Sequence, residues 1–343
     1  MVAAICTEIE HRVDYLPDGP IETIYFGGGT PSILNEEELA KIFTTIEKHF
    51  TISPDAEITL EANPDDLSEA RLKTLKDSPL NRLSIGVQSF FQEDLVYMNR
   101  AHDAQEAERS IQLAHDFGFE NMSIDLIYGA PTTTDEQWAA NVDKLIQWKI
   151  PHLSCYALTV EPGTALDHFI KKGTSLPVDE AKAARQFTYL MDTLEAAGYE
   201  HYEISNFCLP GHHARHNTNY WRGVPYLGIG PSAHSFDGPS RQWNVANNAK
   251  YIKAIDNQNT IFEKEILSST DQHNEYIMTA LRTKWGVDLS FLEKRWDKTV
   301  AQEFATGMAA VVARGEAKQD GTVYRLTKRG RLLADGIAAG LFI

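Results

Sequence analysis

Short apolar runs alternate with amphipathic segments along residues 1–207. Six runs have the composition and length of β-strands, and the segments between them repeat apolar residues every three or four positions, as helices do. The runs cover residues 21–28, 56–64, 82–89, 121–131, 152–159 and, with a weaker pattern, 199–207. A strand–helix repeat of about 30 residues predicts parallel strands joined by crossover helices.

The helical pattern is clearest at residues 35–50, where apolar residues share one helix face and three glutamates occupy the first turn. Negative charge is favourable there because it faces the positive end of the helix dipole. Residues 104–119 and 135–150 show the same period. Residues 1–16 also predict a helix, so a helix precedes the first predicted strand.

Polar or glycine-rich motifs follow nearly every predicted strand: GGGTP, EANP, GVQS, YGAP and YALT. A (β/α) barrel builds its active site at the carboxyl ends of its strands, whereas a doubly wound sheet gathers polar residues at one switch point. No GxGxxG motif follows the first run. We therefore predict an α/β fold, a partial (β/α)6 TIM-like barrel whose first strand is missing from the sequence.

The composition changes after the predicted barrel. Residues 208–245 are rich in Gly, Pro, His and aromatic residues, and we expect a functional loop there. Further on, Asp320 and Gly321 carry a hairpin signal, and a final helix is expected at 327–342, which together predict a small α-rich, winged-helix-like domain. We predict three regions, a barrel at 1–207, a His- and aromatic-rich linking region at 208–265 and the small domain at 266–343.

The 343 residues carry a net charge of −16, which argues against nucleic-acid binding. Residues 266–343 hold 9 acids and 11 bases, so DNA binding is not the favoured role of that domain. No apolar run reaches the ~18 residues that a membrane span needs, and residues 1–16 lack the features of a secretory signal. We expect a cytoplasmic protein without a membrane span; peripheral membrane contact and a homodimer stay open.

Three glycines end the first predicted strand, in the stretch IYFGGGTPSI. Glycine lets the backbone approach a ligand closely and adopt positive φ. The alternative is a tight strand-to-helix corner without a ligand. A phosphate loop is not indicated, because no GK[ST] follows.

Polar side chains occupy matching places after the later strands. Glu61 can receive an ammonium group or ribose hydroxyls, and Gln88 can hydrogen-bond a sugar. Asp125 interrupts an apolar run, where an ionised carboxylate is costly unless it is bonded, and Arg100 can bind a carboxylate through two hydrogen bonds. Three of them also have a structural alternative: Glu61 as a capping carboxylate, Asp125 as a satisfied buried residue and Arg100 as a surface ion-pair residue. Together with the glycines, the set offers the contacts that S-adenosylmethionine requires.

Several longer stretches resemble a known family: IYFGGGTPSIL, LEANPDDL, RLSIGVQSFFQEDLVYMNRAHD, SIDLIYGAPTTT and RHNTNYWRGVPYLGIGPSAHS. The chain resembles, over nearly its whole length, the radical S-adenosylmethionine proteins of the oxygen-independent coproporphyrinogen III oxidase group, and most closely their haem-chaperone branch. The resemblance implies a partial (β/α)6 barrel, a small C-terminal domain and S-adenosylmethionine as cofactor. It assigns the methionine end of that cofactor to Gly28, Gly29 and Thr30, the amino group to Glu61, the carboxylate to Arg100 and the ribose to Gln88 and Asp125.

His216 lies in HNTNYW, which matches the HNxxYW motif of the haem-chaperone branch. The resemblance therefore implies that His216 binds haem, and an imidazole is a normal axial ligand of haem iron. The alternative is a loop histidine that orders the turn. The nearby Cys208, His212 and His213 could join His216 in a zinc site, but their spacing fits no common zinc pattern.

The resemblance also implies a [4Fe–4S] cluster on a Cys-x3-Cys-x2-Cys motif, which this sequence lacks. Its three cysteines, Cys6, Cys155 and Cys208, are far apart in the sequence, whereas a cluster needs at least three thiolates together. We expect the cluster only in a longer, complete form of the protein, because of a truncated or misassigned start. The alternative is a variant that has abandoned radical chemistry.

The resemblance favours a haem-binding chaperone that binds S-adenosylmethionine and delivers haem to acceptor proteins of the respiratory chain. The first alternative is an oxygen-independent coproporphyrinogen III oxidase, which performs radical oxidative decarboxylation in haem biosynthesis. The second alternative is a cluster-free protein that only binds S-adenosylmethionine. Whether the chain is an enzyme stays open, because the cluster cysteines are absent from the sequence.

Overall fold

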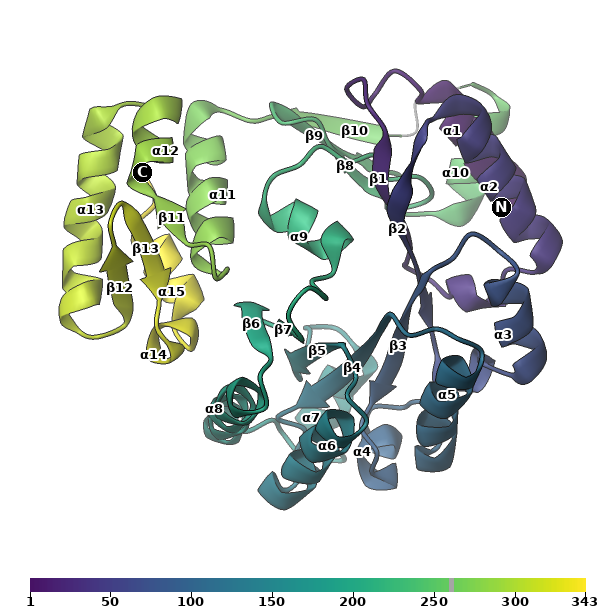
Figure 1. The fold of residues 1–343 in the computed structure, drawn as a ribbon, viewed down its shortest axis with the longest axis horizontal. Helices are drawn as coiled ribbons and strands as arrows, with labels where there is room; N and C mark the ends of the chain where they lie inside the picture. Colours follow the sequence, from purple (N-terminus) through teal and green to yellow (C-terminus); the bar gives the residue numbers. More distant parts are fainter. Residues whose placement is uncertain (259–261) are drawn as a thin grey trace. The chain divides into compact units, whose positions relative to one another are not determined.

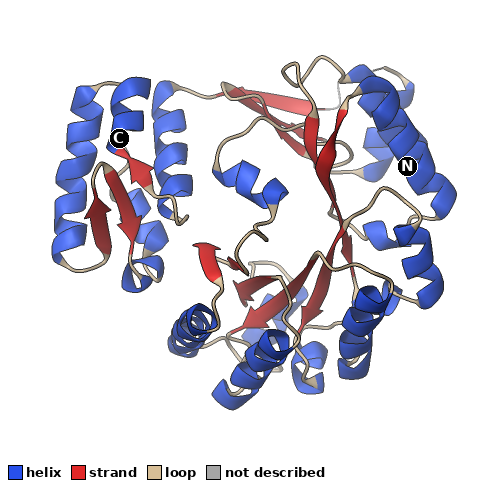
Figure 2. Cartoon of the chain, in the orientation of Figure 1, coloured by secondary structure: helices blue, strands red, loops and turns tan. Residues whose placement is uncertain are grey.

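The computed structural model describes residues 1–258 and 262–343 of the chain, in which helices and strands alternate (Figures 1 and 2). The chain forms two compact units, each assembled from separate segments. Unit 1 comprises Met1–Ile24, Leu34–Ile58 and Arg215–Ile343, and unit 2 comprises Tyr25–Ile33 and Thr59–Ala214. The division between the units falls within the first two strands, β1 and β2. The predicted domain boundaries stay a prediction.

The main sheet has seven strands in the order β1-β2-β3-β4-β5-β7-β6. They are β1 (Ile21–Phe26), β2 (Ile52–Ala62), β3 (Arg82–Gln88), β4 (Met122–Tyr128), β5 (His152–Ala157), β6 (Glu200–Glu203) and β7 (Asn206–Cys208). The pairs β2/β3, β3/β4 and β4/β5 are parallel. The predicted α/β class, with consecutive parallel strands curled as in a partial barrel, is confirmed.

The sixth predicted strand is wrong in its direction. Residues 199–207 do not form one parallel strand; they fold back as the hairpin of β6 and β7, and β7 pairs antiparallel with β5. The carboxylate of Glu203 closes the hairpin turn, accepting hydrogen bonds from the backbone N–H of Ser205 and the side-chain amide of Asn206. A tight turn joins the antiparallel strands β6 and β7 directly, without a crossover helix. The parallel strand–helix repeat therefore ends at β5.

Helices cover the apolar face of strands β3, β4 and β5 within unit 2. The helices of unit 2 are α3 (Glu69–Lys76), α4 (Gln92–Tyr97), α5 (Ala104–Asp116), α6 (Asp135–Gln147), α7 (Ala165–Lys171) and α8 (Glu180–Ala196). All but α7 bury side chains, and Figure 1 shows α5, α6 and α8 beside these strands. Capping boxes begin α5 at Asp103 and α6 at Thr134. Leu83, Ile85 and Ile124 on the covered face are fully buried, as expected for strands under helices.

The opposite face of the same strands is polar. Successive side chains of a strand point to opposite faces, so Arg82 and Ser84 of β3 share one face. In the parallel register Ser84 lies beside Glu61 of β2, and Asp125 of β4 lies beside Ser154 of β5. The sheet therefore buries one apolar face under helices and presents carboxylates, hydroxyls and amides on the other.

Unit 1 contains the helix predicted at the start of the sequence, α1 (Val2–His11), and the helix predicted at 35–50, α2 (Glu36–His49). The expected loop at 208–245 is instead partly regular. It contains the helix α9 (Arg215–Trp221) and the strands β8 (His234–Phe236) and β9 (Ser240–Asn244), which are followed by α10 (Asn248–Asp256) and β10 (Phe262–Ile266).

A fully buried carboxylate, Glu8 of α1, fixes this region of unit 1. It accepts hydrogen bonds from the backbone N–H of Gly230 at 2.8 Å, the amide of Asn244 at 2.7 Å and the hydroxyl of Tyr251 at 2.6 Å. Burial raises the pKa of Glu8, and the three donors oppose that shift. Because a buried carboxylate is costly without partners, these donors explain how a Glu is tolerated in the core.

The end of the chain forms helices around a three-stranded antiparallel sheet of order β11-β13-β12. The elements are α11 (Ser269–Leu281), β11 (Val287–Asp288), α12 (Leu289–Arg295), α13 (Lys298–Ala313), β12 (Ala317–Asp320), β13 (Val323–Leu326), α14 (Lys328–Arg331) and α15 (Ala334–Ala339). The hairpin predicted at Asp320 and Gly321 is confirmed. The single final helix is wrong, because it breaks at Leu332 and Leu333 into α14 and α15. Among the described residues, no helix is both long and apolar enough to cross a bilayer.

Candidate functional site

The glycine loop after β1 leaves its backbone accessible. Gly28 and Gly29 have φ of +71° and +66°, in the left-handed region that favours glycine, and a Cβ at either position would meet no atom within 4 Å. Gly27 differs, because a Cβ there would lie 2.5 Å from the ring of Tyr25 and 3.0 Å from the carboxylate of Glu61. The second and third glycines therefore expose the chain, whereas the first makes room for a contact between two side chains.

That contact anchors Glu61 at the carboxyl end of β2. The hydroxyl of Tyr25 donates to Oε1 of Glu61 at 2.7 Å, and the backbone N–H of Gly28 donates to Oε2 at 3.1 Å. Farther along the loop, beyond the half-buried Thr30, the hydroxyl of Ser32 donates to Asp66 at 2.5 Å. The glycine loop is thus fixed to the end of β2 at both of its ends.

Gly86 of β3 makes room for two of the predicted site residues. A Cβ at Gly86 would lie 2.9 Å from the side-chain nitrogen of Gln88 and 3.3 Å from Nη2 of Arg100, so these two side chains meet over this glycine. Gln88 itself has φ of +68°, which is costly for a residue with a side chain. Strain of this kind is typical of functional positions, where the surrounding structure compensates for it.

Arg100 is held by Nη2, which donates to the side chain of Asn63 at 2.8 Å and to the backbone carbonyl of Gly86 at 3.2 Å. Its Nε is buried and has no hydrogen-bond partner in the structure. A buried N–H without an acceptor costs free energy, so this atom fits an acceptor supplied by a ligand. A carboxylate is the group that a guanidinium binds best.

Asp125 lies half-buried on the polar face of β4. Desolvation raises its pKa to about 7, and the charge of Glu61 adds to this effect, while hydrogen bonds from Ser154 and Ser84 oppose it. The hydroxyl of Ser84 lies 3.4 Å from Oδ1. Asp125 therefore titrates near neutral pH, and Glu61 is close enough to influence it.

A chain of buried polar groups continues from Asp125 across the sheet. The hydroxyls of Ser154 and Ser123 lie 3.0 Å apart, Ser123 lies 2.7 Å from Nδ1 of His152, and Nε2 of His152 lies 2.7 Å from the hydroxyl of Tyr202. Burial lowers the pKa of His152 well below its usual value, so this imidazole is neutral at pH 7. These hydrogen bonds satisfy the buried polar groups next to Asp125 on the polar face of the sheet.

The geometry brings the predicted adenosyl-site residues together within unit 2. Glu61 is connected to Gly28, Gln88 meets Arg100 over Gly86, and Asp125 interacts with Glu61. The unpartnered Nε of Arg100 and the open glycine backbone fit the carboxylate and methionine end of S-adenosylmethionine. Sequence reasoning missed Tyr25, Asn63 and Ser154, although strand alternation places Tyr25 on the face of Gly27 and register places Ser154 beside Asp125.

The cysteines do not fit a [4Fe–4S] cluster. Cys6 lies in α1 of unit 1, whereas Cys155 and Cys208 lie on β5 and β7 of unit 2, and all three are buried and free of disulfides. Burial raises the pKa of the Cys155 thiol, which disfavours the thiolate that a cluster requires. We therefore derive no chemical step through a cluster in this chain.

His216 lies half-buried at the start of α9, in unit 1. Its Nδ1 lies 2.8 Å from the hydroxyl of Thr23, and its Nε2 lies 3.0 Å from the hydroxyl of Tyr220. The carboxylate of Glu57 accepts the backbone N–H groups of Arg215 and His216, each at 3.0 Å. No local pattern predicted the roles of Thr23 and Glu57, because both are more than 150 positions away from His216.

A row of aromatic rings extends from His216; its first two contacts are edge to face and its last, between Tyr226 and Phe236, is tilted. The ring centroid of His216 lies 4.9 Å from that of Tyr220, which lies 4.5 Å from Tyr226, and Tyr226 contacts Phe236 at 6.3 Å. Such a row offers ring edges and faces to a flat apolar ligand. The half-buried imidazole of His216, at the end of this row, fits the role of an axial ligand of haem iron.

The zinc alternative has no support in the part of the chain that the structure describes, where no three His, Cys, Asp or Glu side chains are grouped for a metal. Cys208 is fully buried on β7. His213 forms a 3.2 Å ion pair with Glu200 when protonated, and His212 is exposed.

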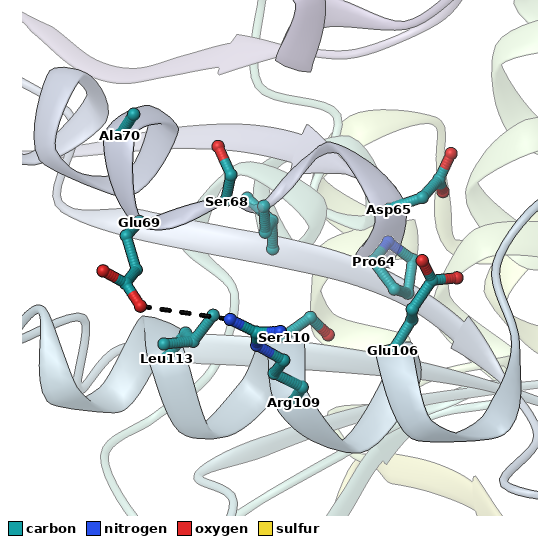
Figure 3. Close-up of a pocket in the computed structure, with 10 residues that line it drawn as sticks. Pro64, Asp65, Ser68, Glu69, Ala70, Glu106, Arg109, Ser110 and Leu113 are labelled. Atoms are coloured by element: carbon teal, nitrogen blue, oxygen red, sulfur yellow. Dashed lines mark ion pairs between the residues drawn. The ribbon is translucent and has the colours of Figure 1, made fainter.

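A groove of about 340 Å³ lies elsewhere in unit 2, between the segment before α3 and helix α5 (Figure 3). Glu69 and Arg109, 3.9 Å apart, form an ion pair at its edge. None of the predicted site residues lines it; its lining comes from residues 64–70 and from helix α5. We therefore place the candidate site on the polar face of the strands and not in this groove.

Comparison with known proteins identifies the family. Residues 5–145 match the radical SAM superfamily and residues 267–333 match the HemN C-terminal domain. The chain is 34% identical over 339 residues to the Heme chaperone HemW of Mycobacterium tuberculosis, covering 98% of this chain and 85% of that protein. The chain belongs to the HemW family. The Heme chaperone HemW of Bacillus subtilis is 32% identical over 319 residues, covering 92% of this chain and 84% of that relative.

The fold of this HemW-family chain is similar to a solved structure as well. The coproporphyrinogen III oxidase HemN of Escherichia coli, a radical SAM enzyme, superposes with a TM-score of 0.84 at 25% identity, covering 99% of this chain and 82% of that one. The likeness supports the curled, mainly parallel sheet and the helical C-terminal part. The family resemblance expected from the motifs is confirmed.

Proposed function

We propose that the chain is a haem chaperone that binds haem through His216 and delivers it to acceptor proteins. The observation that carries this proposal is the half-buried imidazole of His216 at the end of a row of aromatic rings. Relatives named Heme chaperone HemW support it. Acceptors in the respiratory chain and a cytoplasmic location, both predicted from the sequence, remain part of the proposal.

We further propose that unit 2 binds S-adenosylmethionine on the polar face of its strands. Glu61 would accept the ammonium group, Nε of Arg100 would meet the carboxylate, and Gln88 and Asp125 would hold the ribose. Gly28, Gly29 and Thr30 would line the methionine end. Without a cluster, S-adenosylmethionine would be a structural ligand. In a longer form of the protein that holds a cluster, it would be the source of a radical.

A titration with ferric haem tests the chaperone proposal. The intact chain should shift the Soret band of haem, and His216→Ala should remove the shift, with partial rescue by added imidazole. His234→Ala is the matched control, because His234 is an exposed histidine of β8. Equal Soret shifts for the wild type and His216→Ala would reject His216 as the haem ligand.

The second candidate function is oxygen-independent coproporphyrinogen III oxidation, which the fold similarity to HemN favours. The cysteines of this sequence do not fit the cluster that such chemistry uses. Anaerobic incubation of the chain with coproporphyrinogen III, S-adenosylmethionine and a reductant separates the two functions. We expect no decarboxylated product, and product above the blank would favour the oxidase.

A further inference from the structure

His216 makes a hydrogen bond at each ring nitrogen, so it cannot offer a lone pair to iron without a change. Its Nδ1 contacts Thr23 and its Nε2 contacts Tyr220. A neutral imidazole has one N–H donor and one acceptor nitrogen, and the partner of one nitrogen decides the role of the other. The question is therefore which nitrogen carries the proton.

The chemistry of the two hydroxyls answers it. A phenol is a stronger hydrogen-bond donor and a weaker acceptor than an aliphatic alcohol, because its oxygen lone pair is delocalised into the ring. A tyrosine phenol carries its proton at neutral pH, so the Tyr220 hydroxyl, 3.0 Å from Nε2, can donate to it. The favoured arrangement has Tyr220 donating to Nε2 and Nδ1–H donating to Thr23.

We propose that Tyr220 is a gate on His216: its hydroxyl occupies the lone pair of Nε2 until haem iron displaces it, while Thr23 keeps the proton on Nδ1. This inference rests on the proposed haem site and adds the coordinating atom and the residue that controls access to it. Both partners belong to unit 1, as His216 does.

Tyr220 is placed to move, whereas Thr23 is not. Tyr220 is 43% exposed, and its ring meets those of His216 and Tyr226 edge to face. Thr23 lies on β1, a strand of the main sheet. The protonated Nδ1 is therefore held by a fixed partner and the acceptor Nε2 by a displaceable one, which is the asymmetry that a ligand-controlled gate needs.

If Tyr220 is a gate, removing its hydroxyl and removing the hydroxyl of Thr23 should change the affinity for ferric haem in opposite directions. Tyr220→Phe removes a hydrogen bond that competes with iron, so ferric haem should bind between about threefold and tenfold more tightly. Thr23→Val removes the acceptor of Nδ1–H, and the loss of such a partner of a metal ligand typically costs about tenfold or more in affinity. A merely structural role would make both substitutions weaken binding.

Matched controls make the experiment specific. Tyr189→Phe removes a hydroxyl from an exposed tyrosine of α8, outside the aromatic row, and should leave haem affinity within about twofold. Thr23→Ser keeps the acceptor and should restore most of the affinity that Thr23→Val loses. Weaker or unchanged binding in Tyr220→Phe would overturn the gate, and wild-type affinity in Thr23→Val would overturn the role of Thr23.

A measurement without haem separates this inference from the proposed function. Nitrogen-15 shifts of the His216 ring, assigned by comparison with His216→Ala, report which nitrogen carries the proton. We expect protonated Nδ1 in the wild type and a shift toward the other tautomer in Thr23→Val. A proton on Nε2 in the wild type would overturn the gate even if haem binds, whereas a proton on Nδ1 with no haem binding would reject only the chaperone proposal.

Discussion

The carboxylate of Glu57 accepts the backbone N–H of His216 at 3.0 Å, across 159 positions of sequence. Its second oxygen accepts the N–H of Arg215, so one side chain of β2 satisfies two of the free donors at the start of α9. Glu57 is 6% exposed, and its charge faces the positive end of the helix. The orientation of His216 therefore depends on a residue that does not touch its ring.

Removing this cap should loosen α9. We expect Glu57→Ala to lower the free energy of unfolding by about 2 kcal/mol, the upper part of the range for a helix cap, and to weaken haem binding through His216. Urea unfolding and haem titration measure the two effects. Glu57→Gln keeps one acceptor oxygen and should lose about half as much; a wild-type stability for Glu57→Ala would show that α9 does not need the cap.

Glu61 should control the affinity for S-adenosylmethionine through its charge. Glu61→Gln keeps an oxygen for the N–H of Gly28 but cannot pair with an ammonium group. Hydrogen bonds to charged groups contribute about 1.5–3 kcal/mol, so calorimetric titration should show binding weakened between about tenfold and a hundredfold. Tyr25→Phe leaves the charge in place and should cost much less; equal losses in both variants would mean that orientation, and not charge, is what Glu61 provides.

The titration of Asp125 should appear in the stability of the ligand-free protein. Its pKa is raised from 3.8 to about 7 by burial, so the neutral form is favoured in the folded state. The resulting stabilisation is complete below pH 3.8 and is lost as the pH rises through about 7. Asp125→Asn cannot ionise, so we expect it to gain about 1 kcal/mol relative to the wild type between pH 6 and pH 8. A constant difference in urea unfolding at the two pH values would contradict this.

The same carboxyl should make cofactor binding depend on pH in the opposite direction. Ribose hydroxyls donate more strongly to an ionised carboxylate than to a neutral carboxyl. We expect S-adenosylmethionine to bind more tightly at pH 8 than at pH 6, and the difference to disappear in Asp125→Asn. Titrations in one buffer across this interval test it, and a pH dependence that survives in the variant would assign the effect to another group.

Gln88 should lower the stability of the fold and raise its affinity for S-adenosylmethionine. Its φ of +68° costs about 1 kcal/mol that glycine avoids, so Gln88→Gly should be more stable than the wild type by roughly that amount and should bind S-adenosylmethionine less tightly. Lys149→Gly is the matched control, because Lys149 has φ of +54° in the turn after α6. Both should stabilise the protein and only Gln88→Gly should affect binding; a loss of affinity in both would point to a general change in the sheet.

The site residues that could be predicted from the sequence are those placed by a local pattern of strands and strand ends. The glycine loop, Glu61 and Asp125 follow or lie in apolar runs whose parallel pairing brings their ends together. The hairpin of β6 and β7 escaped prediction because a two-residue turn at Ile204 and Ser205 has no glycine or proline to mark it. Contacts such as Thr23 with His216 escaped it because they join residues 193 positions apart, and no local pattern encodes them.

The buried carboxylate of Glu8 has a consequence for how the protein is made. Its three hydrogen-bond donors follow it by 222 to 243 positions, so α1 leaves the ribosome long before any of them exists. At about 5–20 residues per second, this delay lasts roughly 10 to 50 seconds. During translation α1 can pack against α2 early, but the carboxylate of Glu8 and the apolar contact of Ala4 with α10 stay without partners until the end of α10 is made. We therefore expect this part of α1 to be exposed to general chaperones of nascent chains.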